Sequence, residues 1–418
     1  MNFLVFYKDI DNEHRCLFSN NHYETLKYLP ANNEVHHYEV FKGYTATDEG
    51  LASFKVDFLK WCDEIRHNDV LDIDYLKYYC HYSAVEMTFK RLCKGKYEHF
   101  EDIDQVESSW IEKTHNGGLT FCEPGTYQCY SYDFSSFYPT NMSDFNFVIP
   151  YTKGQEMQLK KLPVDIELGF YRVKITSNHK HATKLFAFSK HDVYTSISLK
   201  HALDLVDDYN FKIDLIVDGK PNAYVYKKSM RASKVFGVWY NKLMMVKKLF
   251  PKNKLVKHLL SSLWGSLVHS NNVMKTYEEI QAEGLKVGIG DTADYKIVDY
   301  IWTNTKEYYK LQCMSKPYRT NFRLKSFLTA YGRAKIADVA MENLGDLVRC
   351  HTDGLSFKVP MKFDIKGLIP EEKTTGLIKF EHVNKYSLIP VDERGLAPTS
   401  RGLSLSQASR NFWTGNDI

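Results

Sequence analysis

Residues 130–139 read YSYDFSSFYP, and this stretch decides how the fold is interpreted. The apolar, aromatic run from Tyr127 to Tyr132 predicts a strand, which ends at the acidic residue Asp133. Two serines, an aromatic pair and a proline follow, which is typical of a turn into a new element. An acid at a strand end can hold a divalent cation while the turn amides face phosphates. The same residues also suit a helix-capping aspartate followed by an ordinary turn.

A second acid, Asp353, lies in the segment HTDG between two apolar runs, 346–350 and 355–359. Asp-Gly between apolar runs predicts a β-hairpin, so the carboxylate belongs to its tip. By itself this aspartate is more typical of a turn than of a metal site. A helix is predicted over 321–344, just before the hairpin.

The charge pattern is uneven, although the net charge is only +4. From Gly219 to Tyr277, 59 residues contain twelve Lys or Arg and no Asp or Glu, which suggests an element that faces phosphates. Two helices are predicted there, over 232–249 and 252–268, and their short connection makes them an antiparallel hairpin. One face of the second helix carries Lys254, Lys257, Ser261 and Trp264. These side chains could hold phosphates and a base, and a basic amphipathic surface helix explains the same pattern equally well.

The bulk composition sets further limits. A chain of 418 residues predicts two to four domains, and its eight scattered cysteines contain no C-x-x-C pair. We therefore expect free thiols in a reducing compartment and no zinc site. No apolar stretch approaches the roughly 20 residues that cross a bilayer, and no targeting signal is seen. An intracellular protein without a membrane partner is expected.

Taken together and in order, these stretches resemble the motifs of family B DNA polymerases. Residues 132–139 are similar to the first palm motif D-x-x-S-L-Y-P, 257–265 to the fingers motif K-x-x-x-N-S-x-Y-G, and 351–354 to the second palm motif D-T-D-S. The sequence NGG at 116–118 is similar to the Y-x-G-G turn, and TAYGR at 329–333 to the T-A-x-x-R helix. The resemblance covers about residues 61 to 389.

The resemblance implies an α+β fold, the polymerase right hand: a palm of antiparallel sheet with helices, helical-hairpin fingers and a small thumb, with a reduced N-terminal domain. The implied domains are 1–115, a shortened exonuclease-like remnant; 116–143, the first segment of the palm; 144–226, an insertion of the protein-primed type; 227–269, the fingers; 270–320, a second insertion; 321–370, the second segment of the palm; and 371–418, a short thumb or C-terminal segment.

The subgroup looks like the protein-primed viral, phage and organellar-plasmid polymerases. Lys257 lies 124 positions after Asp133, which leaves room for the insertion that marks this subgroup. Of the exonuclease carboxylates only Asp69 has a similar setting, so we expect no proofreading. Replication of a virus, phage or linear mobile element is implied, in the host cytoplasm or with the virion.

The resemblance also implies roles for individual residues. The catalytic residues are Asp133 and Asp353, and these two with the carbonyl of Phe134 bind two Mg²⁺ ions, with Mn²⁺ as an alternative. The nucleotide-binding residues are Ser135, Ser136, Phe137, Tyr138, Lys247, Lys248, Lys254, Lys257 and Ser261. The template- and primer-binding residues are Asn116, Gly117, Gly118, Trp264, Gly265, Arg333, Thr352 and Lys385. The implied partners are template and primer DNA, dNTP, and a terminal protein or accessory replication subunit as a candidate.

The sequence departs from the family pattern at several positions. His351 replaces the first aspartate of D-T-D-S, while Ser261 and Trp264 replace the fingers Asn and Tyr. The basic K-x-Y thumb signature is missing, with Lys385-Tyr386 as a weak substitute. Two other functions therefore stay open: a polymerase-derived DNA-binding or structural protein with weakened catalysis, and a reverse-transcriptase-like or template-independent nucleotidyltransferase.

Overall fold

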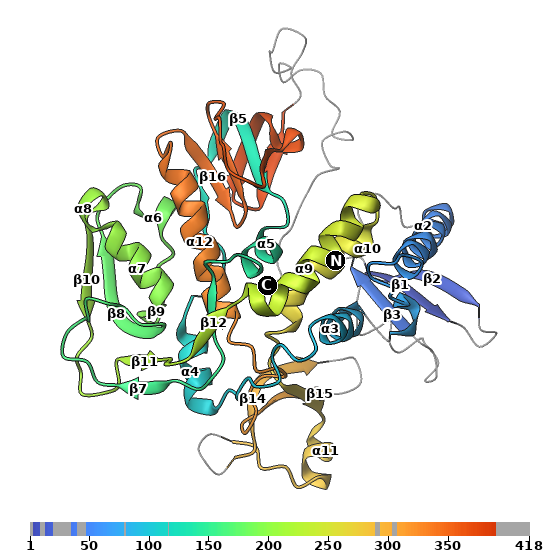
Figure 1. Ribbon diagram of the computed structural model, residues 1–418, viewed down its shortest axis with the longest axis horizontal. Helices are drawn as coiled ribbons and strands as arrows, with labels where there is room; N and C mark the ends of the chain where they lie inside the picture. Colours follow the sequence, from blue (N-terminus) through green and yellow to red (C-terminus); the bar gives the residue numbers. More distant parts are fainter. Residues whose placement is uncertain are drawn as a thin grey trace. The chain divides into compact units, whose positions relative to one another are not determined.

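The computed structural model describes residues 3–8, 13–19, 35–39, 47–78, 81–115, 117–288, 293–302 and 307–389 (Figure 1). The chain forms two compact units. The first unit comprises residues 1–100, 142–147 and 231–269, and the second comprises 101–141, 148–230 and 270–418. Each unit therefore draws on several separate stretches of the sequence.

The first unit combines a small antiparallel sheet with helices. Its sheet has the order β2-β1-β3, with bounds Phe3–Lys8 (β1), His14–Ser19 (β2) and Val35–Glu39 (β3). Its helices are α2 (Asp48–Arg66), the short 3-10 helix η1 (Tyr75–Lys77), α3 (His81–Leu92), α9 (Ser233–Leu249) and α10 (Lys254–Ser266). Helices α9 and α10 confirm the predicted basic pair to within two residues at each end.

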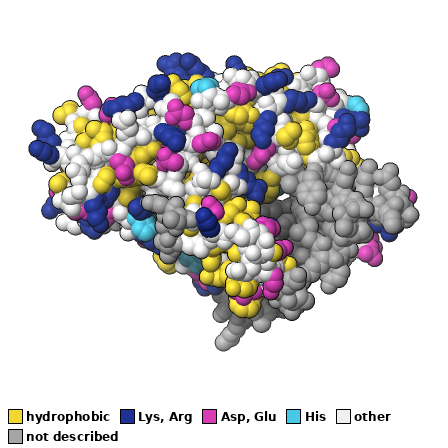
Figure 2. All heavy atoms as spheres, turned by 90° about the horizontal axis from the view of Figure 1, so that it is seen from below, with side chains coloured by type: hydrophobic (Ala, Val, Ile, Leu, Met, Phe, Trp, Pro, Cys, Tyr) yellow, Lys and Arg dark blue, Asp and Glu magenta, His cyan; other side chains and the backbone are white. Residues whose placement is uncertain are grey.

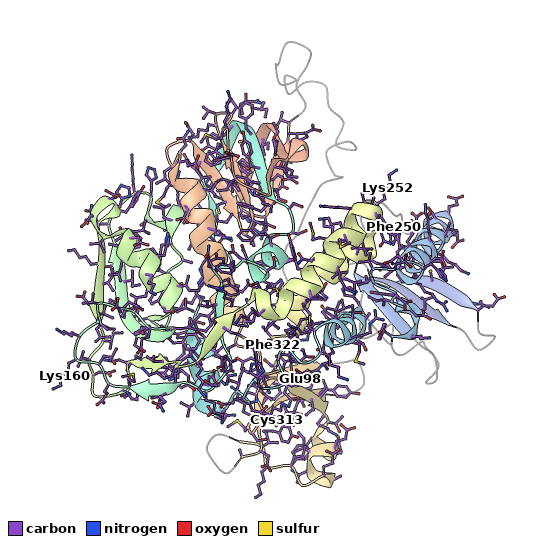
Figure 3. All side chains as sticks on the ribbon, viewed as in Figure 1. Glu98, Lys160, Phe250, Lys252, Cys313 and Phe322 are labelled. Carbon is purple, nitrogen blue, oxygen red and sulfur yellow. The ribbon has the colours of Figure 1, made fainter. Side chains whose placement is uncertain are left out.

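The connection between α9 and α10 is well defined (Phe250 and Lys252 in Figure 3). Asn253 caps α10, because its side chain accepts a hydrogen bond from the Val256 N–H. The Asn253 amide also donates to the Trp61 carbonyl (3.0 Å) and to Glu64 Oε2 (2.9 Å). The basic hairpin is therefore tied to α2 within its own unit.

The second unit is built on an antiparallel sheet, called here the central sheet. Its strand order is β20-β19-β5-β17-β16-β4, and β18 also pairs with β5. The strands are β4 (Thr120–Cys122), β5 (Gly125–Phe134), β16 (Leu347–His351), β17 (Gly354–Phe357), β18 (Leu368–Pro370), β19 (Gly376–His382) and β20 (Lys385–Leu388). The predicted strand before Asp133 and the predicted hairpin are both confirmed.

Two helices accompany the central sheet, α5 (Phe137–Met142) and α12 (Lys325–Met341). Helix α12 confirms the predicted helix, but it begins four residues later and ends three residues earlier. Ile336, Ala337 and Ala340 of α12 are buried in the same apolar cluster as Leu355 and Phe357 of β17. Beyond the 3-10 helix η2 (Glu372–Thr374), the described part of the segment predicted as a thumb forms β19 and β20, which extend the central sheet at one edge.

The predicted first insertion forms a second sheet with the order β10-β8-β11-β7, to which β9 adds by pairing with β8. Its strands are β7 (Gln155–Met157), β8 (Gly169–Ser177), β9 (Val193–Thr195), β10 (Phe211–Leu215) and β11 (Ala223–Val225). Its helices are α6 (Ala182–Leu185), α7 (Ser196–Asp204) and α8 (Val206–Tyr209). The short strands β6 (Val148–Pro150) and β12 (Ser229–Arg231) pair beside it, and α4 (Gln105–Lys113) precedes the Gly-Gly turn.

In this region the sequence predicts a strand over 184–188, which is wrong, and a helix over 191–209, which is confirmed only in part. Residues 184–188 do not form a strand, because Lys184 belongs to α6. Its buried ammonium group donates to the carbonyls of Leu344 (2.8 Å) and Leu347 (2.6 Å), a long-range contact that overrides local propensity. Within the predicted helix over 191–209, residues 196–204 and 206–209 are helical as α7 and α8, whereas residues 193–195 form strand β9 and Leu205 interrupts the helix.

The predicted second insertion forms a three-stranded sheet with the order β13-β15-β14. Its elements are β13 (Asn272–Lys275), α11 (Tyr277–Ala282), β14 (Tyr295–Trp302) and β15 (Glu307–Cys313). A full capping box at Thr276 and Glu279 begins α11.

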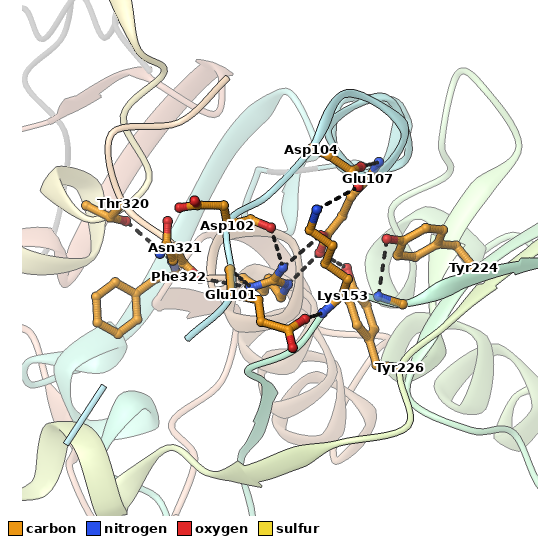
Figure 4. Close-up of polar contacts among 12 residues, drawn as sticks. Glu101, Asp102, Asp104, Glu107, Lys153, Tyr224, Tyr226, Thr320, Asn321 and Phe322 are labelled. Carbon is orange, nitrogen blue, oxygen red and sulfur yellow. Dashed lines mark hydrogen bonds and ion pairs between the residues drawn. The ribbon is translucent and has the colours of Figure 1, made fainter. Parts of the chain in front are cut away.

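Glu107 and Arg323 form an ion pair whose side chains are 0% exposed (Figure 4 shows the surrounding network). Arg323 Nε and Nη2 donate to the two Glu107 carboxylate oxygens at 2.6 and 2.9 Å, and the Tyr226 hydroxyl donates to Oε1 at 2.6 Å. Arg323 Nη1 also donates to the Glu101 carbonyl at 2.7 Å. Burial raises the pKa of Glu107, and the Arg323 charge opposes that shift. This buried network ties α4 to the segment before α12.

The surface carries both signs of charge. On the face drawn in Figure 2, Lys and Arg side chains are interspersed with Asp and Glu. Across the described ranges, no helix is both long and apolar enough to cross a membrane.

Candidate active site

Strand pairing brings Asp133 and Asp353 together. Asp133 is the last residue but one of β5, and in the antiparallel register it lies opposite Gly354 of β17. The Phe134 N–H donates to the Asp353 carbonyl at 3.0 Å. A Cβ added at Gly354 would lie 3.4 Å from Asp133 Oδ1. Both aspartates are partly exposed. Asp133 lies at the end of β5 and Asp353 in the turn between β16 and β17, so two residues more than 200 positions apart in sequence come together at one end of the sheet.

The hairpin tip is held by the glycine turn that precedes the central sheet. Thr352 has a φ of +60°, and its N–H donates to the Leu119 carbonyl at 2.9 Å. A Cβ at Gly118 would lie 2.7 Å from Thr352 Oγ1 and 3.0 Å from its Cα, so only glycine fits without moving the tip. This close approach fixes the segment that carries Asp353.

Arg333 stands behind the same turn. Its Nη1 donates to the Gly117 carbonyl at 2.6 Å and its Nη2 to Ser198 Oγ at 3.2 Å. Burial lowers the pKa of Arg333 to about 10, and the neighbouring Tyr138 opposes that shift. The prediction that this side chain contacts template or primer is wrong, because the guanidinium is buried against protein acceptors. Arg333 instead positions the turn.

The turn after Asp133 also differs from the prediction. The Ser135 N–H donates to the Gly367 carbonyl at 2.9 Å, so this amide does not face a phosphate as predicted. Ser136 has a φ of +56°, which starts the turn into α5. Phe137 is only 4% exposed and packs in the apolar cluster, so its ring cannot contact a nucleotide. The exposed Ser135 side chain stays a candidate contact.

The side chain of Tyr138 interacts electrostatically with Asp353. Burial raises the pKa of Tyr138 to about 12; the charge of Arg333 lowers it and that of Asp353 raises it further. Its ring lies against α12, since a Cβ at Gly332 would come within 3.4 Å of Tyr138 Cε1. The phenol therefore stays protonated and lies in the electrostatic range of Asp353.

His351 occupies the position of the family's first aspartate. Burial lowers the pKa of His351, and the Arg349 charge lowers it further. The ring is therefore neutral at pH 7 and above, and it adds no charge next to Asp353.

The donor set at the hairpin tip suits a hard cation. The two carboxylates supply the oxygen ligands that Mg²⁺ prefers, and Mg²⁺ is commonly held by one or two carboxylates plus water and substrate phosphates. Within the described ranges there is no group of three or more His, Cys, Asp or Glu that could hold a metal alone. The residues present thus fit an ion shared with a phosphate-bearing substrate.

The predicted fingers residues belong to the first unit. Lys248, Lys257 and Ser261 are exposed, whereas Lys247, Lys254, Trp264 and Gly265 are partly buried. Burial lowers the pKa of Lys247, as does Lys257, and burial lowers that of Lys254, whose ammonium lies 5.6 Å from the Trp61 ring centroid. Their contact with a nucleotide stays a prediction.

Asn116 and Lys385 were also predicted to contact DNA. Asn116 lies outside the described residues. Lys385 is exposed at the start of β20 and pairs with Glu381, and its contact with DNA stays a prediction. Ser198, Leu119 and Gly367 also support the site, and the sequence did not predict them. Only their long-range partners reveal them, so no local signal could have found them.

The fold of this chain has counterparts among solved structures. Among solved structures, it is similar to phi29 DNA polymerase complexed with single-stranded DNA, with a TM-score of 0.54 and 12% identity over 86% of this chain and 64% of that chain.

Two further phi29 DNA polymerase structures match. The complex with primer-template DNA has a TM-score of 0.53 at 14% identity, and the ternary complex with incoming nucleotides has 0.52 at 15%. Each covers 84% of this chain and 61% of that chain, so the chain spans less than two thirds of the polymerases it matches. At these identities the likeness concerns the fold. No protein-family model and no curated protein sequence matches the chain.

Proposed function

We propose that the chain is a DNA-directed DNA polymerase that adds deoxynucleotides to a 3′-OH. The pairing of β5 with β17 carries the proposal, because it brings Asp133 and Asp353 to one end of the sheet. The likeness to phi29 DNA polymerase structures supports the same class of fold.

In the proposed reaction the 3′-oxygen forms a bond to the α-phosphorus of a dNTP while the bond to pyrophosphate breaks. Asp133, Asp353 and the Phe134 carbonyl would hold two Mg²⁺ ions, or Mn²⁺, which lower the pKa of the 3′-OH and offset charge on the leaving pyrophosphate. The β5–β17 pairing holds the two carboxylates in place before substrate arrives, which is the positioning that this chemistry needs.

Other side chains take supporting roles in the proposal. Tyr138 excludes the 2′-OH of ribonucleotides, and its ring is well fixed for this because it packs on α12. The exposed Lys257 and Lys248 neutralise the triphosphate, while Trp264 and Gly265 contact the base pair. The right-hand layout and its domain boundaries, including an N-terminal exonuclease remnant without proofreading, belong to the same proposal.

The biological setting is the most specific part of the proposal. The chain would replicate a virus, phage or linear mobile element, with priming by a terminal protein. The small sheets formed by residues 155–225 and 272–313 support this setting, because they fall in the stretches where the two insertions of the subgroup are expected.

Primer extension by the purified protein tests the proposal. We expect incorporation of dNTP on a DNA template with Mg²⁺ or Mn²⁺, and none by the Asp353→Ala variant. Asp214→Ala, which removes an exposed carboxylate from β10, is the matched control and should stay active. Synthesis on RNA, or without a template, would favour the other nucleotidyltransferase classes. No incorporation by the wild-type chain would favour a DNA-binding protein.

A further inference from the structure

A pocket of about 580 Å³ lies between α4 and the sheet of the first insertion. Neither Asp133 nor Asp353 lines it, so it is distinct from the candidate active site. Its charged and titratable lining residues are Lys113, Glu156, Arg172, His191 and Lys220. We propose that this pocket binds a nucleotide unit, with the phosphate on the cationic side chains.

Hydrogen bonds to Asp218 hold the cationic residues Arg172 and Lys220 in place. Arg172 donates to both carboxylate oxygens of Asp218, at 3.0 and 2.6 Å, and its Nη1 also donates to the Pro221 carbonyl at 3.2 Å. The Lys220 N–H donates to Asp218 Oδ1 at 3.1 Å. The loop that carries Lys220 is therefore fixed, and pre-organised cations bind an anion at a smaller entropic cost.

The charge that attracts the ligand comes from two lysines. Asp218 offsets the charge of Arg172, and it holds the pKa of Arg172 above its usual value. Lys113, in the last turn of α4, and Lys220 are both exposed. Two exposed ammonium groups beside a pre-formed pocket are suited to a phosphate.

The lining also contains apolar side chains and a carboxylate acceptor. Val106 is 47% exposed on α4 beside Trp110, and Pro221 and Val193 complete the apolar lining. The Trp110 indole N–H donates to Glu156 Oε1 at 2.9 Å, which fixes the ring and the carboxylate together. An apolar lining with a carboxylate acceptor suits a base with an exocyclic amine, and it disfavours a bare inorganic anion.

The volume also suits this ligand, since pockets of about 300–1,000 Å³ hold molecules of nucleotide size. A free nucleotide and the terminal nucleotide of a single strand offer the same chemistry. The proposal does not depend on polymerase activity, because the pocket shares no residue with the two aspartates.

The test measures binding to the full chain in EDTA, where cation-dependent nucleotide binding is absent. The probes are dAMP, deoxyadenosine and a 5′-phosphorylated oligo-dA, titrated calorimetrically. We expect dAMP or the oligomer to bind, and deoxyadenosine to bind at least tenfold more weakly, because it lacks the phosphate. Competition between dAMP and the oligomer identifies the source of the nucleotide unit.

Charge reversal locates the site. Lys113→Glu with Lys220→Glu should weaken binding at least tenfold. The matched control reverses Lys160 and Lys161, which are exposed on the loop after β7 and do not line the pocket (Lys160 in Figure 3). This control should change binding less than twofold. Circular dichroism and a thermal melt confirm that both variants fold.

Three results would overturn the proposal: no binding of either phosphorylated probe, equal binding of deoxyadenosine, or an equal loss in the Lys160/Lys161 control. The Asp353→Ala variant should bind dAMP as the wild type does. The primer-extension assay and the dAMP-binding assay therefore test the two proposals independently of each other.

Discussion

The second unit contains acidic side chains in two contrasting settings. Glu107 is fully buried, and Arg323 and Tyr226 occupy its carboxylate oxygens. Asp133 and Asp353 are partly exposed and meet where a strand end adjoins a hairpin tip. The comparison teaches that the surroundings decide what an acid does. A buried, fully paired carboxylate organises the fold, whereas two partly exposed carboxylates at a strand end and the neighbouring hairpin tip can hold a cation and take part in chemistry.

The largest effect is expected at the two aspartates. Asp133→Asn and Asp353→Asn should each lower the rate of nucleotide incorporation by about a thousandfold or more, because each removes a charged cation ligand. Neither is buried, so the free energy of unfolding should change little. Single-turnover incorporation and urea unfolding measure the two quantities. Wild-type activity in either variant would contradict the assignment of these partly exposed carboxylates as cation ligands.

The next effect concerns stability instead of activity. Glu107→Gln leaves the Arg323 charge buried without its partner and should lower the free energy of unfolding by about 3–5 kcal/mol. Urea denaturation checks this value. Glu112→Gln on the same helix is the control, because Glu112 is 43% exposed in its pair with Lys296 and should cost under about 1 kcal/mol. Activity per folded molecule should persist in both.

A smaller effect is expected where the glycine turn supports the hairpin tip. Gly118→Ala places a Cβ 2.7 Å from Thr352 Oγ1 and 3.0 Å from a backbone atom, so the tip must shift. We expect about a tenfold loss of kcat from the displaced carboxylate. Gly345→Ala, with 3.9 Å to its nearest neighbour, is the control and should be silent. Equal activities in steady-state assays would show that the contact does not position Asp353.

The smallest effect is expected at His351. Its pKa is lowered by burial and Arg349, so its protonation changes only at pH values below its ordinary range near 6.5. His351→Asn should therefore leave the pH profile of activity unchanged above pH 7. His351→Asp adds a negative charge and should change the ratio of Mg²⁺- to Mn²⁺-supported activity about threefold. A change in the Asn variant above pH 7 would contradict the neutral assignment.

Local patterns predicted the main elements of the fold. The apolar run before Asp133, the Asp-Gly turn at 353–354 and the helix pair joined at Pro251 all depend on neighbours in sequence, and all three are found in the structure. The family resemblance implied that Asp133 and Asp353 share a site, but the pairing of β5 with β17 was not predicted, because no local pattern specifies which strands meet.

The failures have one physical cause, contacts between residues far apart in the sequence. Lys184 donates to carbonyls 160 and 163 residues away, and residues 184–185 end the short helix α6 instead of starting a strand. Arg333 is directed at the Gly117 carbonyl, 216 residues away, and not at DNA. The Ser135 amide is occupied by Gly367. Residue type predicted polar contacts at these positions, but the partner is decided by tertiary packing.

The most direct test of the central claim is a titration of Mn²⁺ in the presence of dNTP. Electron paramagnetic resonance measures the free ion and so gives the number of ions bound. The two carboxylates on β5 and the β16–β17 tip should hold the cations jointly. The account predicts that the wild-type chain binds two ions and that Asp133→Asn and Asp353→Asn each lose at least one. Unchanged Mn²⁺ binding in both variants would contradict it.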